Sequence, residues 1–170
     1  MVKYLFTFLV CCTVTFATTL VKVPDNFDRS SKGYWDALLY QIEHTDDDVV
    51  LLWEGHGGKV DLAEDVMKRL GTIQKKIKIK IVGASISMHG IIVCNLPNLI
   101  EFNQSVIILH NLFSGSTGHK NFNDTETRRL LTVCVRAGII TEQDVERVIT
   151  RKQRVEIYPD GTKIFKEDWK

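Results

Sequence analysis

A serine and a histidine that each follow an apolar segment are the residues of this chain best suited to covalent chemistry. Ser87 comes after the alternating run Ile77–Ile81 and a turn of small residues, and His110 follows Gln104–Leu109. A serine hydroxyl becomes an effective nucleophile when a neighbouring imidazole removes its proton. If a helix begins at Ser87, its first backbone N–H groups can stabilise an oxyanion. The alternative interpretation is an ordinary helix cap, since serine, glycine and alanine are common in turns.

The segments around these residues predict an α/β fold with a mainly parallel sheet. Alternation predicts a strand over Ile77–Ile81, and the continuous apolar run Val49–Trp53 predicts a strand buried on both faces. Apolar residues at helical spacing predict an amphipathic helix over Val60–Ile73. Because parallel strands end at the same edge of a sheet, we expect the GHGG turn after the first strand, Ser87 and His110 to share one rim.

The C-terminal third is predicted to contain two helices and a hairpin. The helices are expected over Arg128–Ala137 and Thr141–Thr150, the second with a capping-box-like start. The polar run SGSTGHKNFNDTET before them is predicted to be a flexible loop. Val155–Tyr158 and Lys163–Phe165, separated by a Pro-Asp-Gly turn, predict a short hairpin.

The first seventeen residues have the layout of a secretory signal peptide. Lys3 precedes the uncharged apolar stretch Tyr4–Phe16, and small residues surround a cleavage position after Ala17. The stretch is short for a transmembrane helix, and the alternative is a buried first strand or helix. We therefore predict removal of residues 1–17, a single domain over 18–170 that begins at Thr18, no stable membrane span, and export to the periplasm or the exterior.

Composition argues against nucleic acid as a partner and allows one disulfide bond. The chain has 22 basic and 21 acidic residues, so it lacks the basic field that favours nucleic-acid binding. Cys94 and Cys134 remain after removal of the predicted signal peptide. An oxidising compartment would allow them to form a disulfide. Two buried thiols fit equally well, because each cysteine lies in an apolar run.

Three short motifs occur in an order that resembles a known family, the proteolytic subunit of the Clp peptidases in the Clp/crotonase superfamily. The turn GHGG-K-V resembles the family's SPGG-x-V turn, which implies that the Gly57 N–H binds the oxyanion. The segment GASISM resembles its G-x-A-A-S-M element, with Ser87 as nucleophile and the Met88 N–H as second oxyanion donor. The strand VIILH resembles its V-M-I-H strand, with His110, 23 residues after Ser87, as general base.

The resemblance implies a third catalytic residue that orients the imidazole. The family places an aspartate two residues before an aromatic, and Glu156 precedes Tyr158 at that spacing. Asp160 in the hairpin turn is the fallback, although aspartate is also a common turn former. The match to Glu156 requires a gap in the alignment of this chain with the family's motif. If the final helix is aligned without that gap, Lys152 falls at the acid position, which would leave a Ser–His dyad or an inactive site.

The implied protein is a serine endopeptidase that cleaves short or unfolded peptides without a cofactor or metal. The implied fold consists of repeated β-β-α units with a mainly parallel sheet flanked by helices. A homo-oligomer is compatible with the family, but the segment after His110 is shorter than the handle region that builds the family's double-ring chamber.

His56 and His89 replace a proline and a glycine of the family, so each is either a second pocket group or a bystander. The alternatives are a binding or assembly protein with a decayed site, and a crotonase-like acyl-CoA enzyme.

Overall fold

The structure, a computed structural model, describes residues 18–74, 77–97, 100–102, 104–114 and 121–168. The predicted signal peptide, residues 1–17, lies outside the described residues. None of the described helices is long and apolar enough to cross a membrane.

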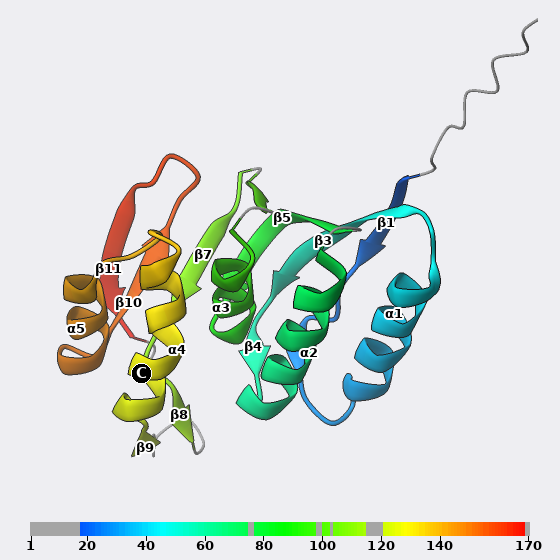
Figure 1. The fold of residues 1–170 in the computed structure, drawn as a ribbon. Helices are drawn as coiled ribbons and strands as arrows, with labels where there is room; N and C mark the ends of the chain where they lie inside the picture. The colour runs from blue at the N-terminus through cyan, green and yellow to red at the C-terminus, as the bar shows by residue number, and fades with distance from the viewer. Residues whose placement is uncertain (1–17, 75–76, 98–99, 103, 115–120, 169–170) are drawn as a thin grey trace, which may run out of the picture.

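Within the described residues, seven strands form one mainly parallel sheet, which confirms the predicted fold class (Figure 1). These strands are β1 (Thr18–Lys22), β3 (Asp48–Gly55), β5 (Ile77–Ile86), β6 (Ile100–Phe102), β7 (Val106–Leu109), β10 (Gln153–Ile157) and β11 (Lys163–Glu167). Their order is β1-β3-β5-β7-β10-β11, with β6 beside β5. The pairs from β1 to β7 are parallel, and β10 and β11 add the predicted hairpin in antiparallel fashion.

Two short strand pairs lie outside the main sheet and border the predicted site. They are the parallel pair of β2 (Asn26–Phe27) with β4 (Gly57–Gly58), and the antiparallel pair of β8 (Phe113–Ser114) with β9 (Asn121–Phe122). The first pair ties the GHGG turn to the loop after β1.

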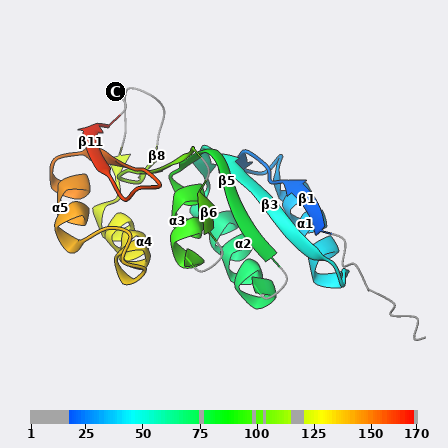
Figure 2. The same cartoon turned by 90° about the horizontal axis from the view of Figure 1, so that it is seen from above.

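The helices pack on one face of the sheet, as Figure 2 shows. They are α1 (Lys32–His44), α2 (Val60–Ile73), α3 (Met88–Asn95), α4 (Asp124–Arg136) and α5 (Glu142–Thr150). One prediction is corrected by this arrangement: β3 is not buried on both faces. Val49, Leu51 and Trp53 are buried whereas Val50 and Leu52 are partly exposed, because the helices cover only one side.

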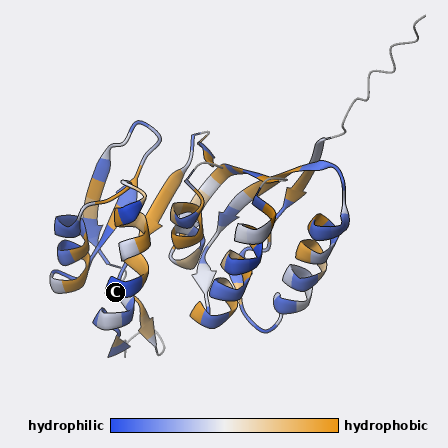
Figure 3. Cartoon of the chain, in the orientation of Figure 1, coloured by the Kyte–Doolittle hydropathy of each residue, from blue (hydrophilic) through white to orange (hydrophobic). Residues whose placement is uncertain are grey.

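Helix α3 lies at the centre of the helical layer, between α2 and α4 (Figure 1). Every residue from Met88 to Cys94 is buried, as expected of a helix that is apolar on all sides. Figure 3 shows this contrast with α2 and α5, which carry many hydrophilic residues. Gly90 allows the close packing, since a Cβ there would lie only 3.0 Å from side-chain atoms of Ile107 and Leu109 on β7.

The last two helices begin where capping groups are present. Helix α4 starts at Asp124, four residues before the predicted Arg128, because the Asn123 side chain accepts a hydrogen bond from the Glu126 N–H at 3.0 Å. Part of the predicted flexible loop is therefore helical. Helix α5 has the predicted capping box, in which Thr141 and Asp144 exchange side-chain-to-backbone hydrogen bonds.

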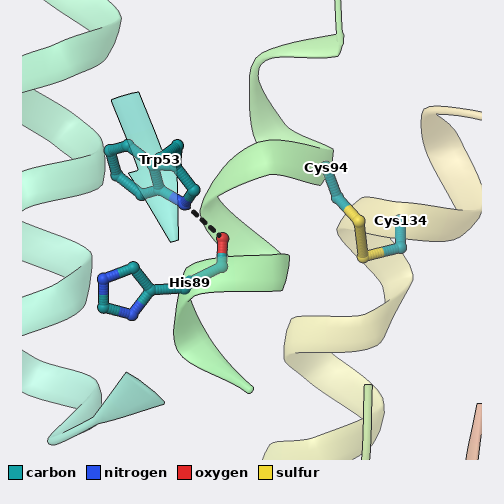
Figure 4. The surroundings of a disulfide bond; sticks show 4 residues. All are labelled: Trp53, His89, Cys94 and Cys134. Atoms are coloured by element: carbon teal, nitrogen blue, oxygen red, sulfur yellow. Dashed lines mark hydrogen bonds between the residues drawn. A yellow bond between two sulfur atoms is a disulfide. The ribbon is translucent and has the colours of Figure 1, made fainter. Parts of the chain in front are cut away.

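A disulfide between Cys94 and Cys134 joins α3 to α4 (Figure 4). Their Cα atoms lie 4.8 Å apart, within the range that disulfide bonds span. The structure thus decides between the two alternatives that the sequence left open.

Replacing both cysteines with alanine is expected to reduce the free energy of unfolding. The bridge closes a segment with a sequence separation of 40, and loop-closure entropy for that length is worth about 4 kcal/mol. Urea unfolding of the wild type and of Cys94→Ala/Cys134→Ala measures the difference. A reductant should lower the midpoint of the wild type and leave the variant unchanged; an unaltered wild-type midpoint would contradict the prediction.

Candidate active site

Ser87 occupies a sharp turn between β5 and α3. Its backbone has φ 58° and ψ −122°, a region that residues with a side chain rarely adopt. Two hydrogen bonds hold the turn: the Ser87 N–H donates to the Ile108 carbonyl at 2.8 Å, and the Ser87 carbonyl accepts from the Ile91 N–H at 3.0 Å. Such strain costs about 1–3 kcal/mol and persists where the surrounding structure enforces it.

Strand pairing brings His110 close to this turn. Ile86 pairs with Ile108 in parallel register, so the next residues, Ser87 and Leu109, are neighbours and His110 is one position further. Ser87 and His110 line the same cavity of about 650 Å³, with exposed fractions of 7% and 8%. A cavity of this size fits a small ligand or a few residues of peptide. The remaining lining residues are Phe27, Asp28, His56, Gly58, Lys59, Val60, Leu112, Phe113 and Ser114.

The imidazole of His110 is oriented by a backbone carbonyl. His110 Nδ1 lies 2.8 Å from the Asn111 carbonyl oxygen. A carbonyl can only accept, so Nδ1 carries the proton and Nε2 is the basic nitrogen of the neutral ring. This is the tautomer that a general base for a serine requires.

A polar network that runs from the core to the surface holds Asn111 in place. Its Nδ2 donates to Asp124 Oδ1 at 2.7 Å, and its Oδ1 lies 2.6 Å from the Thr127 hydroxyl. Thr127 also accepts from the Leu112 N–H at 2.9 Å, and Lys152 Nζ donates to Asp124 at 2.6 Å. The hydrogen bonds from Asn111 and then Lys152 lower the pKa of Asp124. The network therefore links the residue after His110 to α4 and to a negative charge.

Sequence reasoning missed Asn111, Asp124 and Thr127. The available signal was the sequence Asn-Asp-x-Glu at residues 123–126, which is typical of a helix start and would have placed Asp124 on the first turn of α4. Lys152, considered as a substitute for the acid, takes part in this network as the partner of Asp124.

The two predicted acids have other partners among the described residues. Glu156 is on β10, opposite Ile108, and its carboxylate binds Arg154, Tyr158 and Lys166. Burial raises the pKa of Glu156, but these hydrogen bonds outweigh burial and hold it below its ordinary value. Asp160 accepts from the Thr162 N–H at 2.8 Å and shapes the hairpin turn. The described residues that line the cavity include neither of them.

The predicted oxyanion donors differ in their surroundings. The Gly57 N–H donates to His89 Nδ1 at 3.1 Å, whereas Gly58 lines the cavity. The backbone of Gly57 nevertheless lies against Ser87, since a Cβ at Gly57 would be 2.6 Å from Ser87 Cβ. Met88 is the first residue of α3, where backbone N–H groups have no partner within the helix. Gly58 thus lines the cavity itself, whereas Met88 adjoins Ser87 at the start of α3, and the amides of these two residues are the candidates for binding an oxyanion.

The two unexpected histidines have separate places. His56 lines the cavity, whereas the side chain of His89 is fully buried behind the GHGG turn. Only His56 is thus positioned as a second pocket group.

Comparison with known proteins supports the fold. No protein-family model and no curated sequence matches the chain. Among solved structures it is similar to the crystal structure of the ClpP protease catalytic domain from Plasmodium falciparum, with a TM-score of 0.60 and 13% identity over 81% of this chain and 76% of that chain. The chain has the ClpP fold. At this identity the likeness concerns the fold alone, and the chemistry of this ClpP-fold protein depends on its own residues.

The strain at Ser87 predicts an unusual effect of substitution. The free energy of unfolding of Ser87→Gly should be about 1 kcal/mol larger than that of Ser87→Ala, because glycine adopts this backbone conformation without steric cost. The glycine variant is thus expected to be the more stable of the two. Both variants lack the hydroxyl, so the difference between their free energies of unfolding, measured by chemical denaturation, reports the cost of the backbone conformation at residue 87. An alanine variant as stable as the glycine variant would show that the turn is not strained.

Proposed function

We propose that this ClpP-fold protein is a serine endopeptidase that cleaves short or unfolded peptides. The observation that carries the proposal is the strained turn at Ser87, which places a hydroxyl in the cavity that His110 also lines. Backbone strain concentrates at catalytic sites, because folding alone does not favour it. A serine that served only as a helix cap would need no such conformation, and the Ser87 side chain makes no cap hydrogen bond to α3.

In the proposed mechanism His110 Nε2 removes the Ser87 proton as Oγ attacks the peptide carbonyl. The carbonyl π bond breaks and its oxygen becomes an oxyanion near the Met88 and Gly58 N–H groups. The C–N bond then breaks, and His110 returns the proton to the leaving amine. Water, activated by His110, hydrolyses the acyl-enzyme and restores the Ser87 hydroxyl. Gly58 replaces Gly57 as the proposed donor, because the Gly57 N–H is bound to His89.

We assign the orienting role of the third residue to the Asn111 carbonyl, with Glu156 as the alternative. The carbonyl fixes the tautomer of His110. It carries no net charge, so it stabilises the imidazolium less than a carboxylate would. Asp124, one hydrogen bond further along through Asn111, supplies a negative charge at longer range.

A fluorophosphonate probe tests the proposal directly. The probe should react with Ser87 in the wild type, as located by peptide mass spectrometry, because only an activated serine reacts rapidly. Ser87→Ala should remove the label, and His110→Ala should slow labelling by at least about a hundredfold. Labelling that persists in Ser87→Ala would refute the proposal.

Further arms of the same experiment separate the alternatives. Glu156→Gln should label within about threefold of the wild-type rate if Asn111 orients the histidine, whereas a loss of about 10⁴-fold would identify Glu156 as the acid. A wild type that fails to label but binds coenzyme A would favour a crotonase-like acyl-CoA enzyme. Failure to label without coenzyme A binding would favour a binding or assembly protein with a decayed site.

We also propose that the protein is exported. The residues that precede β1 have the composition of a signal peptide, and disulfides such as Cys94–Cys134 are rare in reducing compartments. Intact mass analysis of the protein from an expressing cell should show a chain that begins at Thr18. A chain that retains residues 1–17 in the soluble cytosolic fraction would contradict this prediction.

A further inference from the structure

We propose that His89 is a positioning residue, whose ring holds the turn Gly55–Gly58 against Ser87 and thereby sets the place of the oxyanion donors. The inference rests on the proposed serine peptidase function, in which the Gly58 N–H receives the oxyanion. His89 itself does not line the cavity, so it would act through the backbone of the turn rather than on the substrate.

Both ring nitrogens of His89 bind backbone groups from separate segments. Nδ1 accepts the Gly57 N–H at 3.1 Å, and Nε2 lies 3.0 Å from the Pro24 carbonyl oxygen. An N–H can only donate and a carbonyl can only accept, so the ring carries its proton on Nε2. The imidazole therefore bridges the glycine turn, the loop before β2 and the first turn of α3.

Aromatic packing fixes the ring in this position. The centroid of His89 lies 4.4 Å from that of Phe27 and 5.4 Å from that of Trp53. The Trp53 indole N–H also donates to the His89 carbonyl at 3.2 Å (Figure 4). Burial lowers the pKa of His89 to about 4. The ring is consequently neutral at neutral pH, and Nδ1 keeps the lone pair that accepts from Gly57.

The backbone of the glycine turn packs closely against the His89 ring and against Ser87. A Cβ on Gly55 would lie 2.5 Å from His89 Nε2, and a Cβ on Gly57 would lie 3.0 Å from Ser87 Oγ. His89 is the second residue of α3 and Ser87 directly precedes that helix, so the proposed nucleophile and the support of the turn are joined through one helix start. A change in the length of the Gly57–His89 bond would therefore shift the Gly58 amide relative to Ser87.

Two substitutions at His89 separate hydrogen bonding from packing. His89→Phe keeps an aromatic ring against Phe27 and Trp53 but offers no acceptor to Gly57. His89→Asn loses the ring but places an amide oxygen near the former position of Nδ1. Fluorophosphonate labelling of Ser87 should slow about a hundredfold in His89→Phe, as for a misplaced catalytic group, and stay within about tenfold of the wild-type rate in His89→Asn. Thermal unfolding should rank the two variants in the opposite order.

Trp35→Phe is the matched control. Trp35 packs on Phe27 and, at a longer distance of 6.3 Å, on the His89 ring, and its indole N–H donates to the Asn26 carbonyl. The substitution therefore weakens the same aromatic cluster but removes neither of the ring nitrogens of His89 nor their backbone partners. Its labelling rate should equal that of the wild type despite a lower melting temperature. Labelling rates that follow melting temperature across all three variants would overturn the proposal.

A measurement on the unaltered protein keeps the inference independent of variant folding. ¹⁵N NMR should show His89 as the neutral Nε2–H tautomer down to about pH 5, with slow exchange of the Gly57 amide proton. A charged ring at pH 6, or the Nδ1–H tautomer, would overturn the proposal. If the probe does not label the wild type at all, the peptidase proposal fails, and the role of His89 in positioning the oxyanion donors fails with it. The NMR result would still decide whether His89 holds the turn.

Discussion

The hydrogen bond from the Ser87 N–H to the Ile108 carbonyl is the contact on which the site depends. It joins the end of β5 to β7 at the point where the chain leaves the sheet and enters α3. The bond ties a strained backbone conformation to the strand that leads to His110. One geometric constraint thus positions both the hydroxyl and the imidazole, although they are 23 residues apart in the chain.

Burial of α3 makes that constraint rigid. The helix is enclosed by the sheet, by α2 and by α4, and the disulfide fixes its C-terminal end to α4. Its N-terminal end carries Ser87 and His89, and α4 in turn carries Asp124 and Thr127 of the network around Asn111. The elements that hold Ser87 and those that hold His110 are therefore parts of one packed core.

Glu156 and Asp124 each have their charge balanced by neighbouring cations. Glu156 faces Arg154 and Lys166 on the sheet, and those cations balance its charge locally. Asp124 is balanced by Lys152 and reaches the histidine segment only through the amide of Asn111. A Ser–His pair oriented by a carbonyl keeps the correct tautomer but forgoes a charge beside the imidazolium, so its nucleophile would be activated less strongly than in a full triad.

The sequence by itself determined the class of fold, the bounds of α2, the capping box of α5, the hairpin and the order of Ser87 and His110 along the chain. These features depend on local periodicity, turn chemistry and the rule that parallel strands end at one edge. Only the tertiary structure decided that β3 is covered on one face, that Cys94 meets Cys134, that the Asn111 carbonyl contacts His110 Nδ1, and that Gly57 binds His89. Each of these depends on which side chains distant in sequence face one another, and that is set by packing across the whole core rather than by any local pattern.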